Sequence, residues 1–150
     1  FLRAESLYNS ATYIDELDEL PSASPPIAPS YGGSLHGESH GESFLATIQN
    51  RFFGNGLYIL DEPEAALSPA RQLTLMRIIG ELVRDNSQFI IATHSPILMA
   101  FPDAEILLFS DSGIAPTGYR QTEHYQITKQ FLDNPKRMLD MIFGGEKDDE

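Results

Sequence analysis

The stretch Leu57–Ser68 (Leu-Tyr-Ile-Leu-Asp-Glu-Pro-Glu-Ala-Ala-Leu-Ser) decides the fold class of this 150-residue chain. It opens with a continuous apolar run, Leu57–Leu60, between Gly56 and Asp61. A short run of this kind is typical of a strand that is buried on both faces in a parallel sheet. The sequence therefore predicts an α/β domain with a parallel sheet.

One helix and two further strands are predicted after this stretch. Ser68 offers an N-cap and Pro69 suits the first helical position, so a helix is expected to begin there and to end near Asp85. Its apolar positions are Leu73, Met76, Ile79 and Val83. The runs Phe89–Thr93 and Ala104–Phe109 predict a second and a third buried strand. The order strand, helix, strand predicts a right-handed parallel crossover.

The residues before Leu57 predict two helices with a loop between them. Glu5–Leu20 has apolar residues at helical spacing and acids on the other face. Residues 21–38 are rich in Pro, Ser and Gly and predict a flexible loop. Residues 39–53 predict a second helix, which Gly54 ends. Its buried stripe is expected at Phe44, Leu45, Ile48, Phe52 and Phe53.

The C-terminal part of the chain predicts two more helices. They span Gln121–Phe143 and are separated by Asn134-Pro135. Their expected core positions are Phe131, Leu132, Met138, Leu139, Ile142 and Phe143. Residues 144–150 predict a disordered acidic tail. The apolar content of 41% suits one domain with a sizeable core, which we place over residues 1–143.

The composition excludes several kinds of protein. A formal net charge of −12 argues against a direct nucleic-acid surface, which needs clustered Lys and Arg. The chain has no cysteine, so it has neither disulfides nor a thiolate metal site, and a reducing cytoplasm fits this composition. Phe1–Leu20 carries too many acids for a signal peptide. No apolar run approaches the roughly 20 residues of a membrane span, and we expect a cytoplasmic protein.

Acidic and imidazole groups follow two of the predicted strands, at the edge where open parallel sheets bind their ligands. Asp61 and Glu62 follow one strand, and His94 follows the other. A strand-end aspartate can hold Mg²⁺ beside the phosphates of a nucleotide. Glu62 is then placed to act as the general base for an attacking water. His94 can hydrogen-bond the terminal phosphate or that water.

Each of these features also has a purely structural interpretation. Acids often follow strands in turns, and a histidine at a strand end is often only a hydrogen-bonded turn residue. Ser39 and Glu42 have the spacing of a helix capping box. This capping box is compatible with ligand binding, because the free amides of a helix N-terminus also bind phosphates.

Taken in chain order, the motifs between residues 39 and 96 resemble the ABC ATPase superfamily of P-loop NTPases. Asp61 and Glu62 look like its Walker B aspartate and catalytic glutamate, and His94 looks like its switch histidine. Within the superfamily, the pattern looks closer to soluble ATPases related to chromosome-maintenance and repair enzymes than to transporter subunits.

Two further motifs match this superfamily with one departure each. Ser39-His40-Gly41-Glu42 looks like the signature motif, with His40 where a glycine is usual. Ala65-Ala66-Leu67-Ser68 looks like the D-loop, with Ser68 in place of the usual aspartate. His40 narrows the room for a phosphate beside the signature backbone, and Ser68 weakens the role of the D-loop acid across a dimer.

The resemblance implies Mg²⁺-dependent hydrolysis of ATP by a head-to-tail homodimer, in which the signature motif of one subunit contacts the nucleotide of the other. The motifs present belong to the C-terminal half of such a domain. The phosphate-binding loop Gly-x-x-x-x-Gly-Lys-[Ser/Thr] is missing, since no lysine of the chain directly follows a glycine. We therefore expect negligible ATPase activity from this chain alone. The alternatives are a degenerate interaction module that no longer turns over nucleotide, or the nucleotide-binding subunit of a transporter.

Overall fold

The computed structural model describes residues 1–3 and 40–144, together with a few single residues between 6 and 29. Only the backbone is described at His40. The helix predicted over Glu5–Leu20 and the loop predicted over residues 21–38 fall almost wholly outside the described residues. Ser39 and the acidic tail after residue 144 lie outside them as well.

The chain forms two compact units, Phe1–Leu98 and Met99–Glu150. The first contains a parallel sheet, and the second contains an antiparallel hairpin and two helices. The single domain expected over residues 1–143 stays a prediction. Among the described helices, none has the combined length and apolarity that crossing a lipid bilayer requires.

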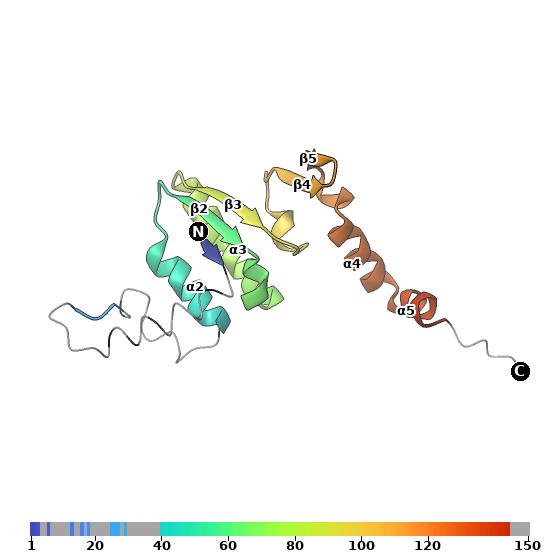
Figure 1. Cartoon of the computed structure of the whole chain (residues 1–150), viewed down its shortest axis with the longest axis horizontal. Coiled ribbons are helices and arrows are strands. Elements are labelled where there is room, and N and C mark those ends of the chain that lie inside the picture. Colours follow the sequence, from blue (N-terminus) through green and yellow to red (C-terminus); the bar gives the residue numbers. More distant parts are fainter. Residues whose placement is uncertain are drawn as a thin grey trace, which may run out of the picture. The chain divides into compact units, whose positions relative to one another are not determined.

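A parallel three-stranded sheet with the order β1-β2-β3 forms the base of the first unit (Figure 1). Its strands are β1 (Leu2–Arg3), β2 (Leu57–Asp61) and β3 (Gln88–Ala92). A helix connects β2 to β3, as parallel neighbours require. The parallel sheet and its strand–helix–strand unit confirm the predicted α/β class.

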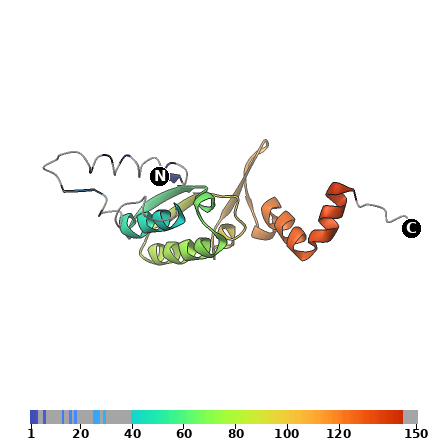
Figure 2. The same ribbon diagram turned by 90° about the horizontal axis from the view of Figure 1, so that it is seen from below.

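Two helices, α2 (His40–Arg51) and α3 (Pro69–Arg84), lie side by side on one side of this sheet (Figure 2). Short 3₁₀ turns follow the strands, with η2 (Pro63–Ala66) after β2 and η3 (Leu98–Ala100) after β3. The apolar side chains buried in this layer are Phe44, Ile48, Leu60, Leu75, Ile78 and Ile79. Phe44, Ile48, Leu60 and Leu75 have no exposed surface at all, so the core lies between β2 and the two helices.

Helix α2 has only part of the predicted buried stripe and is shorter than predicted. Phe44 and Ile48 are buried, whereas Leu45 and Phe52 are half-buried. The helix ends at Arg51, and Phe53 is therefore outside the helix and 66% exposed, which corrects its expected core position. The backbone of Phe53 is held by the Tyr58 hydroxyl, which accepts from its amide (2.7 Å) and donates to its carbonyl (2.8 Å). The ring of Phe52 stacks on Tyr58 with centroids 4.0 Å apart.

Helix α3 begins where the sequence predicts. The Ser68 hydroxyl caps it by accepting from the amide of Arg71 (3.4 Å), and Pro69 occupies its first turn. Its buried face differs from the predicted one, because Leu73 and Val83 are 59% and 44% exposed. The buried positions are Gln72, Leu75, Ile78 and Ile79.

A buried polar residue explains this difference. The side-chain amide of Gln72 donates to the Leu67 carbonyl (3.2 Å), and its oxygen accepts from the Ser95 hydroxyl. Because both polar atoms are satisfied, Gln72 can occupy an interior position that apolar periodicity assigns to a neighbour. The face of α3 that packs against the sheet is therefore rotated about the helix axis, away from Leu73 and Val83.

The opposite face of the sheet is apolar and exposed. Leu57, Ile59 and Ile90 are 61%, 39% and 53% exposed. They share this face because side chains alternate along a strand and Ile59 pairs with Ile90 in the parallel register. The prediction that β2 and β3 are buried on both faces is therefore wrong for the described chain, in which α2 and α3 pack against the other face.

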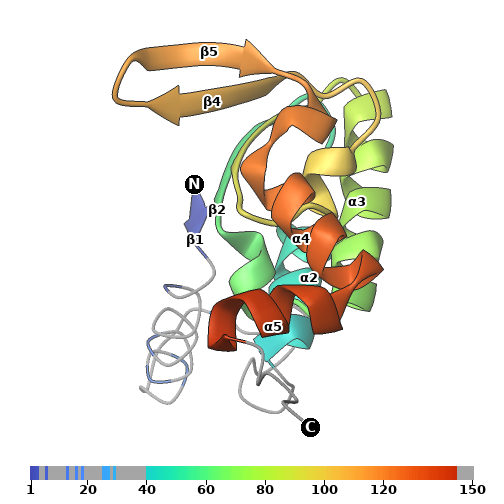
Figure 3. The same ribbon diagram turned by 90° about the vertical axis from the view of Figure 1, so that its right-hand side faces the viewer.

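The second unit opens with an antiparallel hairpin of β4 (Ile106–Ser110) and β5 (Gly113–Thr117), which Figure 3 shows as two opposed arrows. The run Ala104–Phe109 is thus a strand only from Ile106 onward, and the prediction that it is a third buried strand is wrong. Leu107, Leu108 and Phe109 are 48%, 52% and 72% exposed. Gly113 has a φ of 117°, which allows the tight turn back into a strand that contains a proline.

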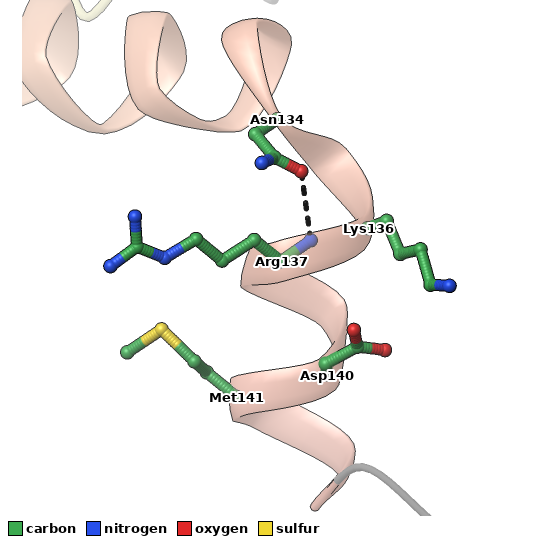
Figure 4. A pocket seen from close by; sticks show the side chains of 5 residues that line it. All are labelled: Asn134, Lys136, Arg137, Asp140 and Met141. Carbon is green, nitrogen blue, oxygen red and sulfur yellow. Dashed lines mark hydrogen bonds between the residues drawn. The ribbon is translucent and has the colours of Figure 1, made fainter.

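A 3₁₀ turn, η4 (Tyr119–Gln121), leads into α4 (Glu123–Asp133) and α5 (Pro135–Phe143). The predicted break at Asn134-Pro135 is confirmed, and the Asn134 side chain caps α5 by accepting from the Arg137 amide at 3.1 Å (Figure 4). None of the six predicted core positions is buried, since Met138 is half-buried and the other five are 38–78% exposed. Two helices in succession offer no second layer that could bury both apolar faces.

The core position of Leu60 leads to a stability test. Replacing Leu60 by Ala should lower the free energy of unfolding by about 2–5 kcal/mol, because it removes a fully buried side chain and leaves a cavity. Leu57→Ala in the same strand is the matched control and should change it by less than about 0.5 kcal/mol. Urea unfolding followed by circular dichroism measures both. Equal losses in the two variants would contradict the described core.

Candidate functional site

The candidate site lies where β2 and β3 end at the same edge of the sheet. Asp61 is the last residue of β2 and pairs with Ala92, the last residue of β3. The pairing continues one residue further, since the Glu62 amide donates to the Ala92 carbonyl (2.9 Å). The predicted residues Asp61, Glu62 and His94 are thus brought together, as parallel strand ends require.

Asp61 has a partner that sequence reasoning missed. Arg3 of β1 is in register with Asp61, and its Nε lies 3.4 Å from the Asp61 Oδ2. Both side chains are partly exposed, so a cation or a nucleotide can reach the carboxylate. Only the strand register links Arg3 to Asp61, and no local pattern in the sequence signals it.

Glu62 has an unusual backbone conformation. Its φ and ψ are 47° and 52°, in the left-handed region that residues other than glycine rarely adopt. The bond to Ala92 on one side and a bond from the Ala65 amide to the Glu62 carbonyl (3.0 Å) on the other hold it there. In this conformation the Glu62 Oε1 lies 3.4 Å from the Nε2 of His94. Backbone strain of this kind often occurs at functional sites.

Glu64 is a second residue that sequence reasoning missed. Its Oε2 accepts from the Thr93 hydroxyl (2.8 Å) and its Oε1 accepts from the His94 backbone amide (2.6 Å). The carboxylate of Glu64 therefore connects η2 to the end of β3. The only local signal for Glu64 is its place in the acidic run after β2.

The signature-like residues are described in part. Ser39 and the side chain of His40 lie outside the described residues, whereas Gly41 and Glu42 lie in the first turn of α2. A Cβ atom at Gly41 would lie 2.7 Å from the Ala66 carbonyl oxygen and 2.8 Å from an Arg71 guanidinium nitrogen. Only glycine allows this approach, so the start of α2 packs directly on η2.

An ion pair strengthens the same contact. The Arg71 Nη2 lies 2.7 Å from the Glu42 Oε1 and joins α3 to the first turn of α2. The D-loop-like residues lead from η2 into α3. Ala65 and Ala66 lie in η2, Leu67 is buried with 5% exposure, and Ser68 caps α3. The signature-like and D-loop-like segments are thus neighbours within one chain.

The carboxylates at this edge suit Mg²⁺ better than a metal that needs a protein cage. Mg²⁺ usually keeps several waters and takes one or two carboxylates together with substrate phosphates. Asp61 and Glu62 supply that number, and no group of three or more His, Asp or Glu side chains that could hold a metal occurs among the described residues. Both Glu64 oxygens already accept hydrogen bonds. Asp61 and Glu62 are therefore the carboxylates at this edge that could hold such an ion.

A hollow on α5 is unrelated to this site. It is open to solvent, and it is lined by Asn134, Lys136, Arg137, Asp140 and Met141 (Figure 4). None of the residues predicted for the site lines it. We assign no function to this hollow.

Comparison with known families is consistent with this geometry. Residues 32–100 match the model of a family described as "AAA domain, putative AbiEii toxin, Type IV TA system". This match supports a P-loop NTPase-type domain. It also indicates nucleotide binding at the level of that domain class, and it spans every predicted site residue. No curated protein matches the chain.

The left-handed conformation of Glu62 leads to a second test. Glu62→Gly should be more stable than Glu62→Ala by about 1 kcal/mol, because glycine adopts this conformation without a Cβ clash. The same pair of substitutions at Glu81, exposed within α3, should give the opposite order by about 1 kcal/mol, since glycine weakens a helix. Denaturant unfolding measures all four variants. An alanine variant that is more stable than the glycine variant at both positions would show that Glu62 is not strained.

Proposed function

We propose that this chain supplies the hydrolytic half of an ABC-type ATPase site. The observation that carries the proposal is the approach of the Glu62 carboxylate to the His94 imidazole, 3.4 Å apart, beside Asp61 at one sheet edge. This arrangement offers a metal-binding carboxylate, a base and a hydrogen-bonding sensor at one edge of the sheet. A structural turn needs none of these three groups to converge.

The roles follow from the chemistry of each group. Mg²⁺, when bound, would neutralise charge on the β- and γ-phosphates, and Asp61 would hold it. Glu62 accepts the proton of the attacking water or orients that water. His94 donates a hydrogen bond toward the terminal phosphate and thereby responds to its presence. Arg3 competes with the cation for Asp61, so the ion pair has to open when the metal binds.

We infer that two copies act together, head to tail. By the resemblance to ABC ATPases, Ser39-His40-Gly41-Glu42 would contact the nucleotide held by the partner subunit, and Ala65-Ala66-Leu67-Ser68 would form the D-loop between the two sites. The described contact of Gly41 with Ala66 supports this inference, since it places both segments next to each other. Closure of the dimer on ATP would then work as a switch, in the cytoplasm.

In this proposal, a phosphate-binding loop outside these residues supplies the backbone amides and the lysine that bind the nucleotide phosphates. The lysines of the chain, Lys129, Lys136 and Lys147, do not follow the glycines that such a loop requires. The second candidate function is therefore a degenerate interaction module that binds a partner without turnover. The intact set of Asp61, Glu62 and His94 favours the enzyme.

The proposed role of Glu62 predicts its effect on turnover. In a protein that joins this chain to a phosphate-binding loop, Glu62→Gln should lower the kcat of ATP hydrolysis by about 10²–10⁴-fold, since the base is lost while its size is kept. Phosphate release measured with Mg²⁺ and saturating ATP tests this. Glu81→Gln on the exposed face of α3 is the control. The 150-residue chain alone should release no phosphate above background, and turnover by it that Glu62→Gln abolishes would overturn the need for an added loop.

The proposed dimer makes a separate prediction. The Glu62→Gln variant of the joined protein should sediment as a dimer with ATP and Mg²⁺ and as a monomer without them, because bound ATP persists when hydrolysis is blocked. Analytical ultracentrifugation distinguishes these states. A monomer at saturating ATP and Mg²⁺ would count against the head-to-tail arrangement.

A further inference from the structure

We propose that Glu64 is a positioning residue that holds Glu62 and His94 at their working separation. This inference rests on the proposed function, since it assigns Glu64 a part in the same site. Glu64 does not touch the reacting groups in our proposal. It acts through the backbone that carries them.

The contacts of the Glu64 carboxylate distinguish positioning from catalysis. Each oxygen accepts a hydrogen bond from a different residue at the end of β3, one from the Thr93 hydroxyl at 2.8 Å and one from the His94 amide at 2.6 Å. Hydrogen bonds to an ionised acceptor are about twice as strong as neutral ones. Because both oxygens accept these hydrogen bonds, the carboxylate holds the residues after β3 in place and is not placed to act as a base.

These two bonds belong to a closed ring of hydrogen bonds. From Glu64 the ring runs through the Thr93 hydroxyl, which also accepts from the Ser95 amide (3.0 Å). The Ser95 hydroxyl donates to the oxygen of Gln72, whose amide donates to the Leu67 carbonyl (3.2 Å). The Leu67 amide donates to the Glu64 carbonyl (3.1 Å) and closes the ring. Both ends of η2 are thus tied to the end of β3.

The ring matters for the site because it acts on the backbone next to both reactive side chains. The side chains of Glu62 and His94 are 41% and 68% exposed, so packing does not fix their separation. Glu62 is joined to Glu64 through the buried Pro63, and Pro63 has a fixed φ. His94 receives the Glu64 bond on its own amide. A shift of the Glu64 carboxylate would therefore change the distance between Glu62 and His94.

Glu64→Gln is the first test, in the protein that joins this chain to a phosphate-binding loop. A glutamine is uncharged and has one acceptor oxygen, so it loses the charge-assisted bonds and leaves Thr93 only an NH₂ group to which its hydroxyl cannot donate. We expect kcat for ATP to fall about 10–100-fold, as for other residues that orient a ligand or base, with KM changed less than about threefold. Glu81→Gln is the matched control, because it removes an exposed carboxylate from α3, and its kcat should stay unchanged.

A second pair of variants leaves Glu64 in place. Thr93→Val removes the hydroxyl that donates to Glu64 with little change of volume, and Thr93→Ser keeps it. We expect Thr93→Val to lower kcat and Thr93→Ser to recover most of the loss. Equal losses in both variants, or unchanged kcat in Thr93→Val and Glu64→Gln, would overturn the inference.

Amide hydrogen exchange of the 150-residue chain gives a readout that needs no turnover. The His94 amide should exchange at least tenfold faster in Glu64→Gln, whereas the Leu60 and Ile90 amides in the sheet should keep their protection. Loss of protection throughout the sheet would show that Glu64 only stabilises the fold and would overturn the inference.

The experiments distinguish an error in the proposed function from an error in this inference. If Glu62→Gln leaves turnover unchanged, the proposed hydrolytic role itself is wrong. If Glu62→Gln abolishes turnover and Glu64→Gln does not lower it, only the positioning role of Glu64 is wrong.

Discussion

The parallel pairing of β2 with β3 is the constraint on which the rest of the first unit depends. Parallel strands that are neighbours in a sheet must be joined by a crossover, and α3 supplies it. The same pairing brings both carboxyl ends to one edge, where Asp61 pairs with Ala92 and Glu62 extends the ladder by one hydrogen bond. The strain in the Glu62 backbone is tolerated because bonds on both sides fix it. The same strand pairing thus forms the sheet and brings the residues of the candidate site together.

Much of this architecture can be predicted from local sequence. The apolar run before Asp61 predicts β2, and Ser68-Pro69 predicts the start of α3, because strand burial and helix capping depend on residues close together in the chain. The meeting of Glu62 with His94 is predictable for a similar reason, since any two parallel strands place their ends together. These predictions needed only the order of the elements.

Other features cannot be predicted locally, because they depend on register or on long-range packing. Arg3 meets Asp61 only through the β1–β2 register, and Glu64 meets His94 only through the turn of η2. Gln72 takes a buried position because Ser95 and Leu67 satisfy it from elsewhere in the chain. Pro116 argues locally against a strand at β5, although proline is tolerated at the edge of a two-stranded hairpin.

The close approach of Gly41 to Ala66 has a consequence for communication between sites. The first turn of α2 cannot move toward η2 without a clash, and η2 begins directly after Glu62 and contains Glu64. In the proposed dimer, a nucleotide that touches α2 from the partner subunit would therefore displace the hydrolytic residues of the other site. Such a contact couples the two binding events energetically, and coupling of this kind is reciprocal. The two sites would then bind ATP cooperatively.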